Sequence, residues 1–411
     1  MTRERVVQIE EPRLPGGGSV AEDAPARRRT FLPFAPPWIG AEEIDEVVRV
    51  LRSDWISTGP CTAAFERDLA NAVMAPSALA LNSCTAGLHT ALAVLGVTAG
   101  DDVITSTLSF AACANVAEHV GARPVLVDVE PDTLTLDPSA VERAITRRTR
   151  AIMPVHYAGH PAEMDAINAV AERHGAAVVE DAAHAPAAAY HGRPIGSGPN
   201  PTAFSFYATK NLTTGEGGML TGEPGFIDEA RVLSLHGMTR DALRRYREGG
   251  SWFYEVVAPG FKYNMTDIQA AIGMWQLRKL GAFQRRRREV VAVYDAAFAT
   301  EEALQIPGRR DGVEHAWHLY VLRLRTEALR IDRDRFIQEL GHRNIGASVH
   351  FIPIHEHPFY RRKYGYRPRD FPVAHESFTR MVSLPLYPRM SDQDVADVVE
   401  AVRDIVREFK R

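Results

Sequence analysis

Residues 204–211 read Phe-Ser-Phe-Tyr-Ala-Thr-Lys-Asn, and residues 215–218 read Gly-Glu-Gly-Gly. Apolar runs at 203–206 and 218–220 predict two adjacent strands joined by a short connection. Lys210 therefore follows a buried strand and precedes a glycine-rich turn, where the backbone can pass close to a bulky ligand. A lysine partly removed from water has a lowered pKa, so its amine can form a Schiff base. A surface lysine whose stem covers apolar neighbours is the alternative that this stretch leaves open.

Short apolar runs alternate with helical patterns around this stretch, from about residue 60 to residue 235. Besides the two strands above, the runs predict strands at 78–81, 103–104, 125–127, 151–153 and 177–179. Such alternation is typical of α/β proteins, in which a mainly parallel sheet carries helices on both faces.

Past residue 265 the pattern changes. It predicts strands at 319–324 and 347–351, and helices at 266–280, 283–298, 333–340 and 391–409. A chain of 411 residues is longer than one hydrophobic core usually supports. We therefore predict a flexible N-terminal tail at 1–29, a large domain at 30–284 and a smaller C-terminal α+β domain at 285–411.

Composition excludes several classes of protein. The net charge is −4, from 48 basic and 52 acidic residues, which argues against a general affinity for nucleic acid. Three scattered cysteines form neither a disulfide framework nor a Cys-x-x-Cys pair, so a reducing cytoplasm is the expected location. The N-terminal segment lacks the apolar run of a signal peptide, and no stretch approaches the ~20 apolar residues that cross a bilayer. We expect a cytoplasmic protein without membrane or nucleic-acid partners.

Two further polar clusters follow predicted strands. Residues 82–87 read Asn-Ser-Cys-Thr-Ala-Gly and precede a predicted helix, whose free N–H groups and dipole suit a phosphate. Ser83 or Thr85 acting only as a helix cap is the alternative. Residues 180–184 read Glu-Asp-Ala-Ala-His directly after a strand. A carboxylate there can bind a metal, act as a base, pair with a cationic heterocycle or be structural.

The three clusters together fit pyridoxal phosphate. This cofactor needs a lysine for its aldehyde, a carboxylate for its pyridinium nitrogen and a cup for its phosphate. The carboxyl ends of strands in an open α/β sheet are where ligands gather. An aromatic ring often covers the cofactor's face, and Phe110 is a candidate, although a core position fits its spacing as well.

Several ordered motifs resemble one family. Ser-x-Thr-Ala-Gly-Leu-His at 83–89, Glu-Asp-Ala-Ala-His-Ala at 180–185, the Lys210 stretch and Gly-Glu-Gly-Gly are similar to the DegT–StrS family of sugar aminotransferases. Residues 55–60 and 263–267 resemble two further family motifs. The resemblance runs from about Phe34 to the C-terminus. It implies the PLP-dependent transferase fold type I, with a mainly parallel seven-stranded sheet in the large domain.

The resemblance also implies roles for individual residues. Lys210 is expected to hold the cofactor and, with Asp181 at the pyridinium nitrogen, to carry catalysis. His184 is expected near the cofactor's 3-hydroxyl. The remaining cofactor-binding residues are Thr85, Ala86 and Ser205 in the phosphate cup, Phe110 stacked on the ring, and Asn264 reaching the phosphate from a partner subunit. The last role implies a homodimer with shared active sites.

Within the family, residues 315–320, 349–351 and 383–388 look closest to enzymes that act at C4 of a nucleotide-linked keto-sugar, such as the one that makes 4-amino-4-deoxy-arabinose. Glutamate is the expected amino donor. His350, Lys262 and His236 are the candidate substrate contacts. Amination at C3 or of a keto-inositol, and a non-catalytic accessory protein of the same fold, remain alternatives. A dehydratase of this family is disfavoured, because that branch has histidine where Lys210 stands.

Two other patterns are interpreted as structural. His355-Glu356-His357 lacks the four-residue spacing of a helical zinc motif and lies between prolines, so we expect a loop with solvated imidazoles and no metal site. Arg285-Arg286-Arg287-Arg288 resembles a nucleic-acid patch, but consecutive helical residues point in all directions. We expect a solvated helix surface there, with one arginine as a candidate contact to a nucleotide diphosphate.

Overall fold

The computed structural model describes residues 28–239 and 253–411. Most of the predicted tail, residues 1–27, lies outside this part. Arg28, which does lie within it, forms ion pairs of 2.6 Å with Asp394 and 2.8 Å with Asp397. Within the described residues, no helix is long and apolar enough to cross a membrane.

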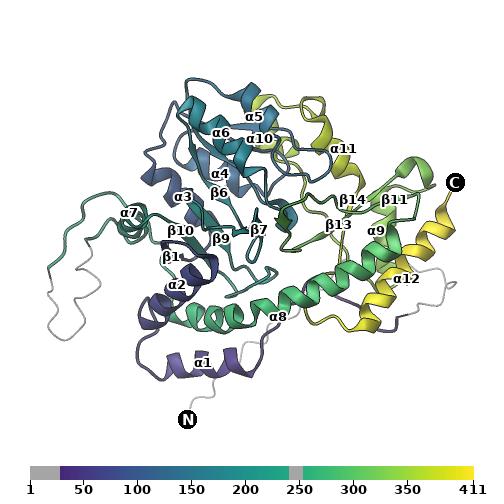
Figure 1. Ribbon diagram of the computed structural model, residues 1–411, viewed down its shortest axis with the longest axis horizontal. Helices are drawn as coiled ribbons and strands as arrows, with labels where there is room; N and C mark the ends of the chain where they lie inside the picture. The colour runs from purple at the N-terminus through teal and green to yellow at the C-terminus, as the bar shows by residue number, and fades with distance from the viewer. Residues whose placement is uncertain (1–27, 240–252) are drawn as a thin grey trace, which may run out of the picture.

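A seven-stranded sheet forms the centre of the N-terminal part (Figure 1). β5 and β6 are one strand interrupted at Val179, whose N–H donates to the carbonyl of Ile152 on β4. The strand order is therefore β1-β10-β9-β6/β5-β4-β2-β3. Only β10 runs antiparallel to the others. These strands span Ser77–Leu81 (β1), Asp102–Ser106 (β2), Arg123–Val127 (β3), Thr149–Met153 (β4), Ala177–Val178 (β5), Glu180–Asp181 (β6), Thr202–Ser205 (β9) and Gly218–Gly222 (β10). The predicted mainly parallel seven-stranded sheet is confirmed.

Both faces of this sheet are buried, because alternate strand residues enter different cores. Leu79 and Leu81 of β1 pack on one face, whereas Ala78 and Ala80 pack on the other. The neighbouring strands β9 and β10 divide their side chains in the same way. Helices cover the two faces, as Figure 1 shows. They are α2 (Pro60–Val73), α3 (Cys84–Val94), α4 (Ala112–His119), α5 (Pro138–Ala144), α6 (Met164–His174) and α7 (Pro224–Ser234).

One long helix, α8 (Asp267–Phe298), replaces the two helices expected at 266–280 and 283–298. Gly281 lies inside α8 and does not end it. A glycine keeps its backbone N–H and costs a helix only about 1 kcal/mol relative to alanine. The first half of α8 packs on the sheet's core, and the second half packs on a separate C-terminal core. The predicted domain boundary at 284/285 thus falls inside a continuous helix.

The C-terminal part is built on a three-stranded antiparallel sheet of order β11-β13-β14. Its strands are Leu304–Gln305, Tyr320–Leu324 and Met381–Leu384. The strand expected at 347–351 is wrong. Only Ser348 pairs with β14, through Ser383. His350 forms its hydrogen bonds through its side chain and its backbone carbonyl, and these are not part of the sheet. The helices here are α9 (Arg333–His342), α10 (Pro358–Tyr364), α11 (Pro372–Arg380) and α12 (Asp392–Phe409), with the single turns η3 (Thr326–Ala328), η4 (Ile354–Glu356) and η5 (Pro368–Asp370).

Small elements complete the fold. Helix α1 (Ala41–Leu51) packs under α8, and its Glu43 bonds Lys279 and Gln276 there. A separate sheet of order β12-β7-β8 lies beside the main one. The remaining elements are β7 (Ala189–Tyr190), β8 (Arg193–Pro194), β12 (Val313–Glu314) and the single turn η1 (Tyr157–Gly159).

The buried carboxylate of Asp267 joins two motifs that are about 200 positions apart in the chain. It accepts hydrogen bonds from the backbone N–H groups of Gly59, Cys61 and Thr62, at 2.8–3.0 Å, and from the Thr62 hydroxyl at 2.6 Å. It thereby satisfies the free donors at the start of α2, which otherwise have no intrahelical partner. This contact explains why residues 55–60 and 263–267 both carry motifs.

We expect Asp267→Ala to lower the free energy of unfolding by about 3 kcal/mol, because three buried N–H groups lose a charged acceptor. Urea unfolding followed by circular dichroism measures the change. Asp45→Ala, which removes an exposed carboxylate on α1, is the matched control and should change stability by less than about 0.5 kcal/mol. Equal effects of the two substitutions would contradict this role.

Candidate active site

The predicted site residues converge where parallel strands end. Asp181 closes β6 and Ser205 closes β9, whereas α3 begins three residues after β1. Because these strands run parallel, their carboxyl ends meet at one edge of the sheet. Gly218 begins the antiparallel strand β10 at that same edge, between Leu81 and Ser205. A Cβ on Gly218 would lie 2.4 Å from the backbone nitrogen of Cys84, so only glycine permits this approach.

The Asp181 carboxylate is buried and held by three donors. The thiol of Cys113 donates to Oδ2 at 2.9 Å, and the N–H of Ala183 donates to Oδ1 at 2.9 Å. The Cys84 thiol lies 3.8 Å from Oδ1. Burial, with the negative charge of Asp181 adding to it, raises the pKa of both thiols well above the usual value. Both therefore stay protonated and act as donors, a role that the sequence did not reveal.

Lys210 lies in the turn after β9, where its backbone N–H donates to the carbonyl of Tyr207. Burial lowers the pKa of Lys210 to about 8, although nearby Asp181 raises it. Among the described residues, none offers its Nζ a hydrogen bond or an ion pair, and the side chain keeps partial exposure. The Lys210 amine is therefore mostly protonated near pH 7, but a much larger fraction of it is neutral than in an ordinary lysine.

Three imidazoles surround Lys210: His184, His318 and His350. The rings of His184 and His318 lie 4.4 Å apart. Burial lowers the pKa of each, to about 4 for His350 and well below the usual value for the other two, and the positive charge of Lys210 adds to the effect. All three are therefore neutral at pH 7. His184 and His350 were predicted from the sequence, whereas His318 was missed.

Each imidazole is oriented by a hydrogen bond at Nδ1. The partners are the Ala158 N–H at 3.2 Å for His184, Asn211 Oδ1 at 3.1 Å for His318 and Ser383 Oγ at 2.9 Å for His350. No hydrogen bond from another described residue reaches Nε2 of these rings, which leaves this nitrogen for a ligand. His318 is held by Asn211, the residue next to Lys210, and that contact between distant segments has no local sequence signal.

The start of α3 has the features expected of the phosphate cup. Ser83 is the helix cap, and its hydroxyl accepts from the Ala86 N–H at 3.1 Å. Thr85 is partly exposed. Ser205 is buried at the end of β9, where its hydroxyl lies 3.4 Å from the backbone nitrogen of Tyr207. The cap alternative therefore holds for Ser83 and leaves Thr85 available.

The ring of Phe110 is 62% exposed, although it belongs to a chain of aromatic contacts. Its centroid lies 5.8 Å from that of Phe351, which in turn lies 5.7 Å from His184. An apolar ring that is exposed at the edge of a polar site can cover the face of a flat ligand. The core alternative for Phe110 is wrong.

Asn264, Lys262 and His236 lie on a neighbouring segment of the same chain. Asn264 pairs with Leu81 through the backbone and donates to Thr58 Oγ1 at 2.6 Å. Lys262 and His236 are exposed and are brought together by the pairing of Lys262 with Leu235. No contact among the described residues joins Lys262 or His236 to Lys210, so their substrate role and the partner-subunit role of Asn264 stay predictions.

The expectation that the four consecutive arginines form a solvated helix surface is wrong for Arg286 and Arg287. Arg287 is buried and donates to the carbonyls of Trp317, His318 and Leu386 at 3.0, 3.3 and 2.8 Å. Arg286 donates to the carbonyl of Met390. This contact has no local sequence signal, because the carbonyls that Arg287 binds lie 30 to 99 residues away.

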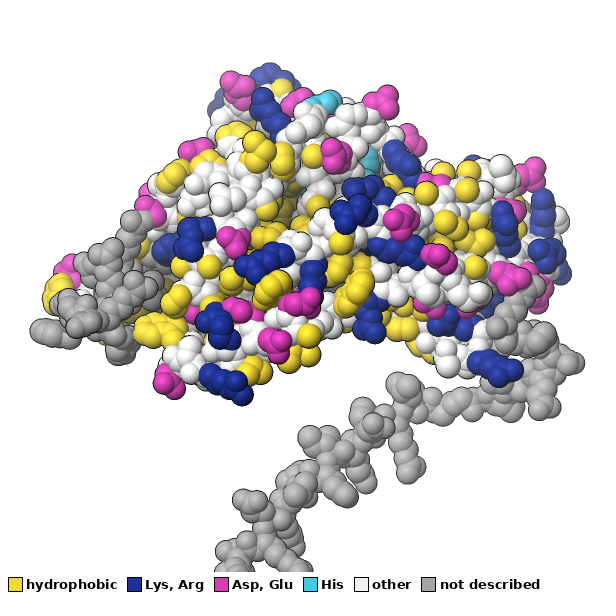
Figure 2. Space-filling model, turned by 60° about the horizontal axis from the view of Figure 1, so that its bottom comes forward, with side chains coloured by type: hydrophobic (Ala, Val, Ile, Leu, Met, Phe, Trp, Pro, Cys, Tyr) yellow, Lys and Arg dark blue, Asp and Glu magenta, His cyan; other side chains and the backbone are white. Residues whose placement is uncertain are grey.

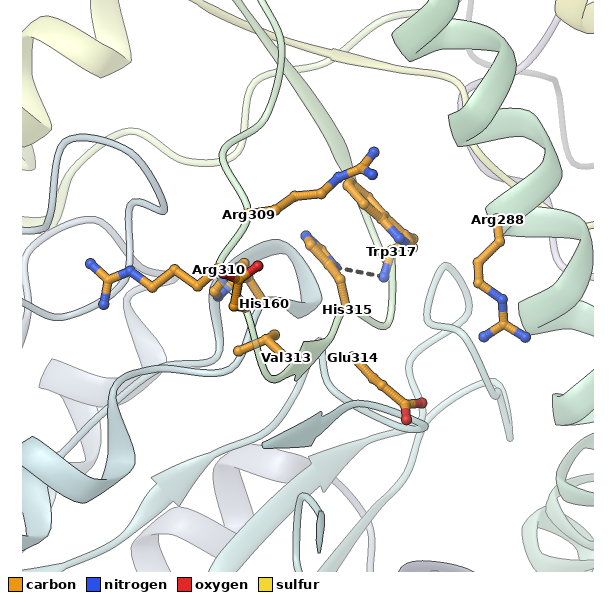
Figure 3. A pocket seen from close by; sticks show the side chains of 9 residues that line it. His160, Arg288, Arg309, Arg310, Val313, Glu314, His315 and Trp317 are labelled. Atoms are coloured by element: carbon orange, nitrogen blue, oxygen red, sulfur yellow. Dashed lines mark hydrogen bonds between the residues drawn. The ribbon is translucent and has the colours of Figure 1, made fainter. Parts of the chain in front are cut away.

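A cavity of about 560 Å³ lies between α8 and residues 309–317 (Figure 3). Figure 3 shows His315 stacked beside Trp317, with centroids 3.8 Å apart, and Arg288 facing them from α8. Of the described residues that line this cavity, none is a predicted site residue. The cavity is therefore separate from the cluster around Lys210.

The residues around Lys210 fit pyridoxal phosphate. An amine with no partner, a buried carboxylate and a helix N-terminus match the aldehyde, the pyridinium nitrogen and the phosphate of this group. Asp181 contributes to the electrostatics of Lys210, so the two lie close enough to serve one ligand. The glycine at 218 brings the backbone of β10 against the start of α3, whereas its predicted approach to a ligand stays a prediction.

The pKa of Lys210 predicts how the cofactor-free protein captures pyridoxal phosphate. A neutral amine is the nucleophile, so the capture rate should rise with pH and level off above about 8, not above the 10.5 of an ordinary lysine. Borohydride trapping at several pH values, followed by peptide mass spectrometry, measures the rate at Lys210. Lys410→Ala, which removes an exposed lysine, should keep this profile, whereas a midpoint near 10.5 would contradict the assignment.

The chain is similar to known proteins over most of its length. A sequence model of the DegT/DnrJ/EryC1/StrS aminotransferase family matches residues 37–403. The spore coat polysaccharide biosynthesis protein SpsC of Bacillus subtilis is 51% identical over 383 residues, which cover 93% of this chain and 98% of that protein.

Two solved structures are similar throughout. Spr1654 from Streptococcus pneumoniae, solved in PLP and PMP forms, has a TM-score of 0.86 and 36% identity in both forms, covering 92% of this chain and 98–99% of the solved chains. The sugar aminotransferase CalS13 from Micromonospora echinospora has a TM-score of 0.82 and 29% identity, covering 90% of this chain and 99% of its own. The chain therefore belongs to the DegT/DnrJ/EryC1/StrS family and is a pyridoxal-phosphate-dependent sugar aminotransferase.

Proposed function

We propose that the enzyme converts a nucleotide-linked 4-keto sugar to the 4-amino sugar, with glutamate as the amino donor. The observation that supports a sugar substrate best is the set of three neutral imidazoles around Lys210. Neutral rings exchange hydrogen bonds with hydroxyl and keto oxygens without the desolvation cost of a buried charge. The relationship to SpsC, a polysaccharide biosynthesis protein, favours a sugar destined for a polysaccharide.

Lys210 has two tasks in this proposal. Bound pyridoxal phosphate supplies an aldehyde that takes up the amino group and a ring that accepts electrons. The Lys210 amine would anchor this group and, as a free amine, would accept and return the proton at the reacting substrate carbon. A pKa of about 8 suits a proton carrier at neutral pH, because both of its protonation states are accessible.

Asp181 keeps a negative charge at the ring nitrogen. Its oxygens accept from Cys113 and Ala183, which orients the carboxylate and prevents its rotation. His184 is assigned to the 3-hydroxyl of the cofactor, and its free Nε2 suits this contact. Thr85, Ala86 and Ser205 are assigned to the phosphate, and Phe110 to the ring face. His350 is assigned to the sugar nucleotide, because its ring lies at the outer end of the histidine cluster against Phe34.

A homodimer with shared sites is the assembly that we propose. Asn264, Lys262 and His236 lie at a surface of the chain next to exposed apolar residues, including Tyr254, Val256 and Val257. Further exposed apolar residues lie on and around α1, namely Ile39, Ile44, Leu51 and Ile56. Figure 2 shows hydrophobic side chains spread between charged ones over the face that carries α1 and α8. Such surfaces are typical of protein–protein contacts.

We expect the enzyme to aminate nucleotide-linked 4-keto sugars with glutamate, yielding equal amounts of 2-oxoglutarate and of a product aminated at C4. Liquid chromatography and NMR of the product measure both. Lys210→Ala should lose multiple turnover, whereas Lys410→Ala should retain wild-type rates. Amination at C3, or turnover of a keto-inositol but of no nucleotide-linked sugar, would refute the substrate assignment.

His350→Gln should raise the KM for the sugar nucleotide by about 10-fold or more, since one hydrogen bond to a bound ligand contributes about 1–2 kcal/mol. The KM for glutamate should change much less, because the two substrates are expected to share only the groups nearest Lys210. Steady-state kinetics with each substrate varied in turn separates the two effects. An unchanged KM for the sugar nucleotide would remove His350 from the substrate site.

Shared sites predict complementation between two inactive variants. Lys210→Ala removes the amine, and Asn264→Asp places a negative charge where the partner subunit's phosphate is expected. Each variant alone should be inactive. Refolding an equal mixture should restore about a quarter of wild-type activity, because half of the dimers are hybrids and each hybrid keeps one intact site. If mass spectrometry shows hybrid dimers but no activity is recovered, Asn264 contributes to the active site of its own chain.

A further inference from the structure

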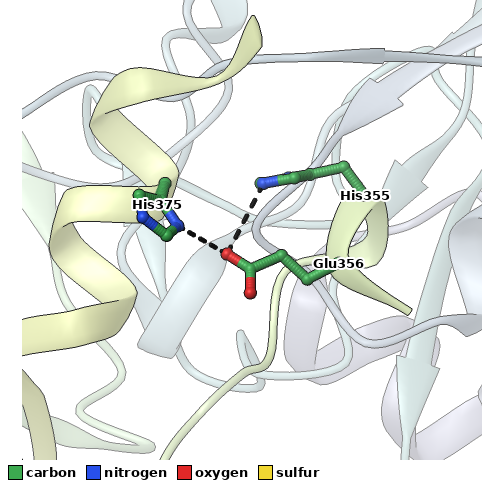
Figure 4. Close-up of side chains that lie close together, drawn as sticks. All are labelled: His355, Glu356 and His375. Carbon is green, nitrogen blue, oxygen red and sulfur yellow. Dashed lines mark hydrogen bonds and ion pairs between the residues drawn. The ribbon is translucent and has the colours of Figure 1, made fainter. Parts of the chain in front are cut away.

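Three side chains outside the aminotransferase site meet at the junction of η4 and α11. They are His355, Glu356 and His375, and their ligand atoms all lie within 4.8 Å of one another (Figure 4). Figure 4 shows both imidazoles directed at the Glu356 carboxylate from opposite sides. Glu356 Oε1 lies 2.6 Å from His375 Nδ1 and 3.7 Å from His355 Nε2.

His355 is fully buried, so the expectation of a solvated imidazole is wrong for this residue. Its Nδ1 bonds the hydroxyl of Thr107 at 2.7 Å, and its ring stacks on Phe371 with centroids 4.6 Å apart. These contacts fix the ring and direct Nε2 toward Glu356. Nε2 itself is buried and has no hydrogen-bond partner among the described residues. A buried polar atom without a partner costs about 1–3 kcal/mol, which a ligand at this position would relieve.

The other two side chains give access from solvent. The Glu356 side chain is 21% exposed and the His375 side chain 40% exposed. Two further carboxylates act on His355. Asp128 accepts from the N–H groups of Val373 and Ala374 and therefore caps α11, and Asp370 accepts from the N–H of Arg367. The available donors are thus two imidazole nitrogens and one carboxylate, with an open side toward water.

We propose that His355, Glu356 and His375 bind a divalent transition-metal ion such as Zn²⁺. Two histidines and one glutamate are a donor set that zinc accepts, with water as a fourth ligand. Zinc–ligand distances of about 2.0–2.2 Å place neighbouring tetrahedral ligand atoms roughly 3.3–3.6 Å apart. The Glu356 carboxylate must therefore move slightly closer to His355 Nε2, now 3.7 Å away, and separate from His375 Nδ1, now 2.6 Å away. The movable side chains of Glu356 and His375 can provide this shift, while Thr107 serves as the outer partner that orients the buried ligand.

The ion would connect segments that are distant in the chain. It would tie α11 to η4, and η4 is already joined to the end of β2 by the bond from the Ile354 N–H to the Thr107 carbonyl, 2.7 Å. Thr107 precedes Phe110 by three residues. A metal at this position therefore stabilises the wall that carries Phe110, and its binding does not depend on the sugar that the enzyme uses.

Zinc titration of the chelator-treated holoenzyme against a chromophoric competitor tests this site. The wild-type protein should bind one tight equivalent per chain. His375→Ala should weaken that equivalent by at least about 100-fold, since it removes a direct ligand. His357→Ala is the matched control: it removes a neighbouring histidine outside the cluster and should bind zinc as the wild type does. Adding zinc should raise the Tm of the wild type and of His357→Ala, but not of His375→Ala.

The proposal is overturned if the wild type binds no zinc under these conditions, or if His375→Ala binds it with wild-type affinity. It is also overturned if His357→Ala loses the same equivalent, because the ligands would then be surface histidines. Glu356→Gln provides a second check, since it keeps the shape of the side chain and should still weaken binding. None of these readouts requires turnover of a sugar, so they are independent of the proposed reaction.

Discussion

The absence of a side chain at Gly218 is the constraint on which the active site depends. Gly218 pairs with Leu81 on one side and with Ser205 on the other, so β10 holds the ends of β1 and β9 at fixed spacing. Its Cα packs against the backbone of Ser83 and Cys84, where any Cβ would overlap. The start of α3, the end of β9 and the turn with Lys210 are brought together by this contact. One antiparallel strand in a parallel sheet thus positions the N-terminus of α3 beside the turn that carries Lys210.

Burial keeps the number of charged side chains in this site small. Asp181 and Lys210 are its main ionisable pair, and the three surrounding imidazoles stay neutral because burial and the positive charge of Lys210 both oppose their protonation. The buried thiols of Cys84 and Cys113 stay protonated beside Asp181 for the same reason. A neutral, hydrogen-bonding surface around one amine and one carboxylate is what a polyhydroxylated substrate needs, because charged walls would have to be desolvated at each binding event.

Local patterns in the sequence were sufficient for the sheet and for the residues at the ends of its strands. Short apolar runs between helical patterns identified the strands, and Lys210 and the Asp181 and Ser83 clusters follow them directly. Contacts between distant segments were not predictable in this way. His318, Cys113 and Asp267 act through partners far along the chain, and the buried ring of His355 is fixed by Thr107, about 250 positions earlier. Residues 347–351 have the composition of a strand, but only Ser348 pairs with the neighbouring strand β14.

The two halves of the chain contribute different parts of the site, and α8 packs on both halves and holds these parts at a fixed relative position. Lys210, Asp181 and His184 come from the large sheet, whereas His318 and His350 come from the C-terminal part. Arg287, in the second half of α8, donates to the carbonyls of Trp317, His318 and Leu386. Burial lowers the pKa of Arg287 to about 9, so burying this charge is costly and its carbonyl partners offset only part of the cost. The loop with His318 has no regular structure before β13. The buried guanidinium of Arg287 binds the carbonyls of this loop and thereby aligns His318 with His184 across the junction.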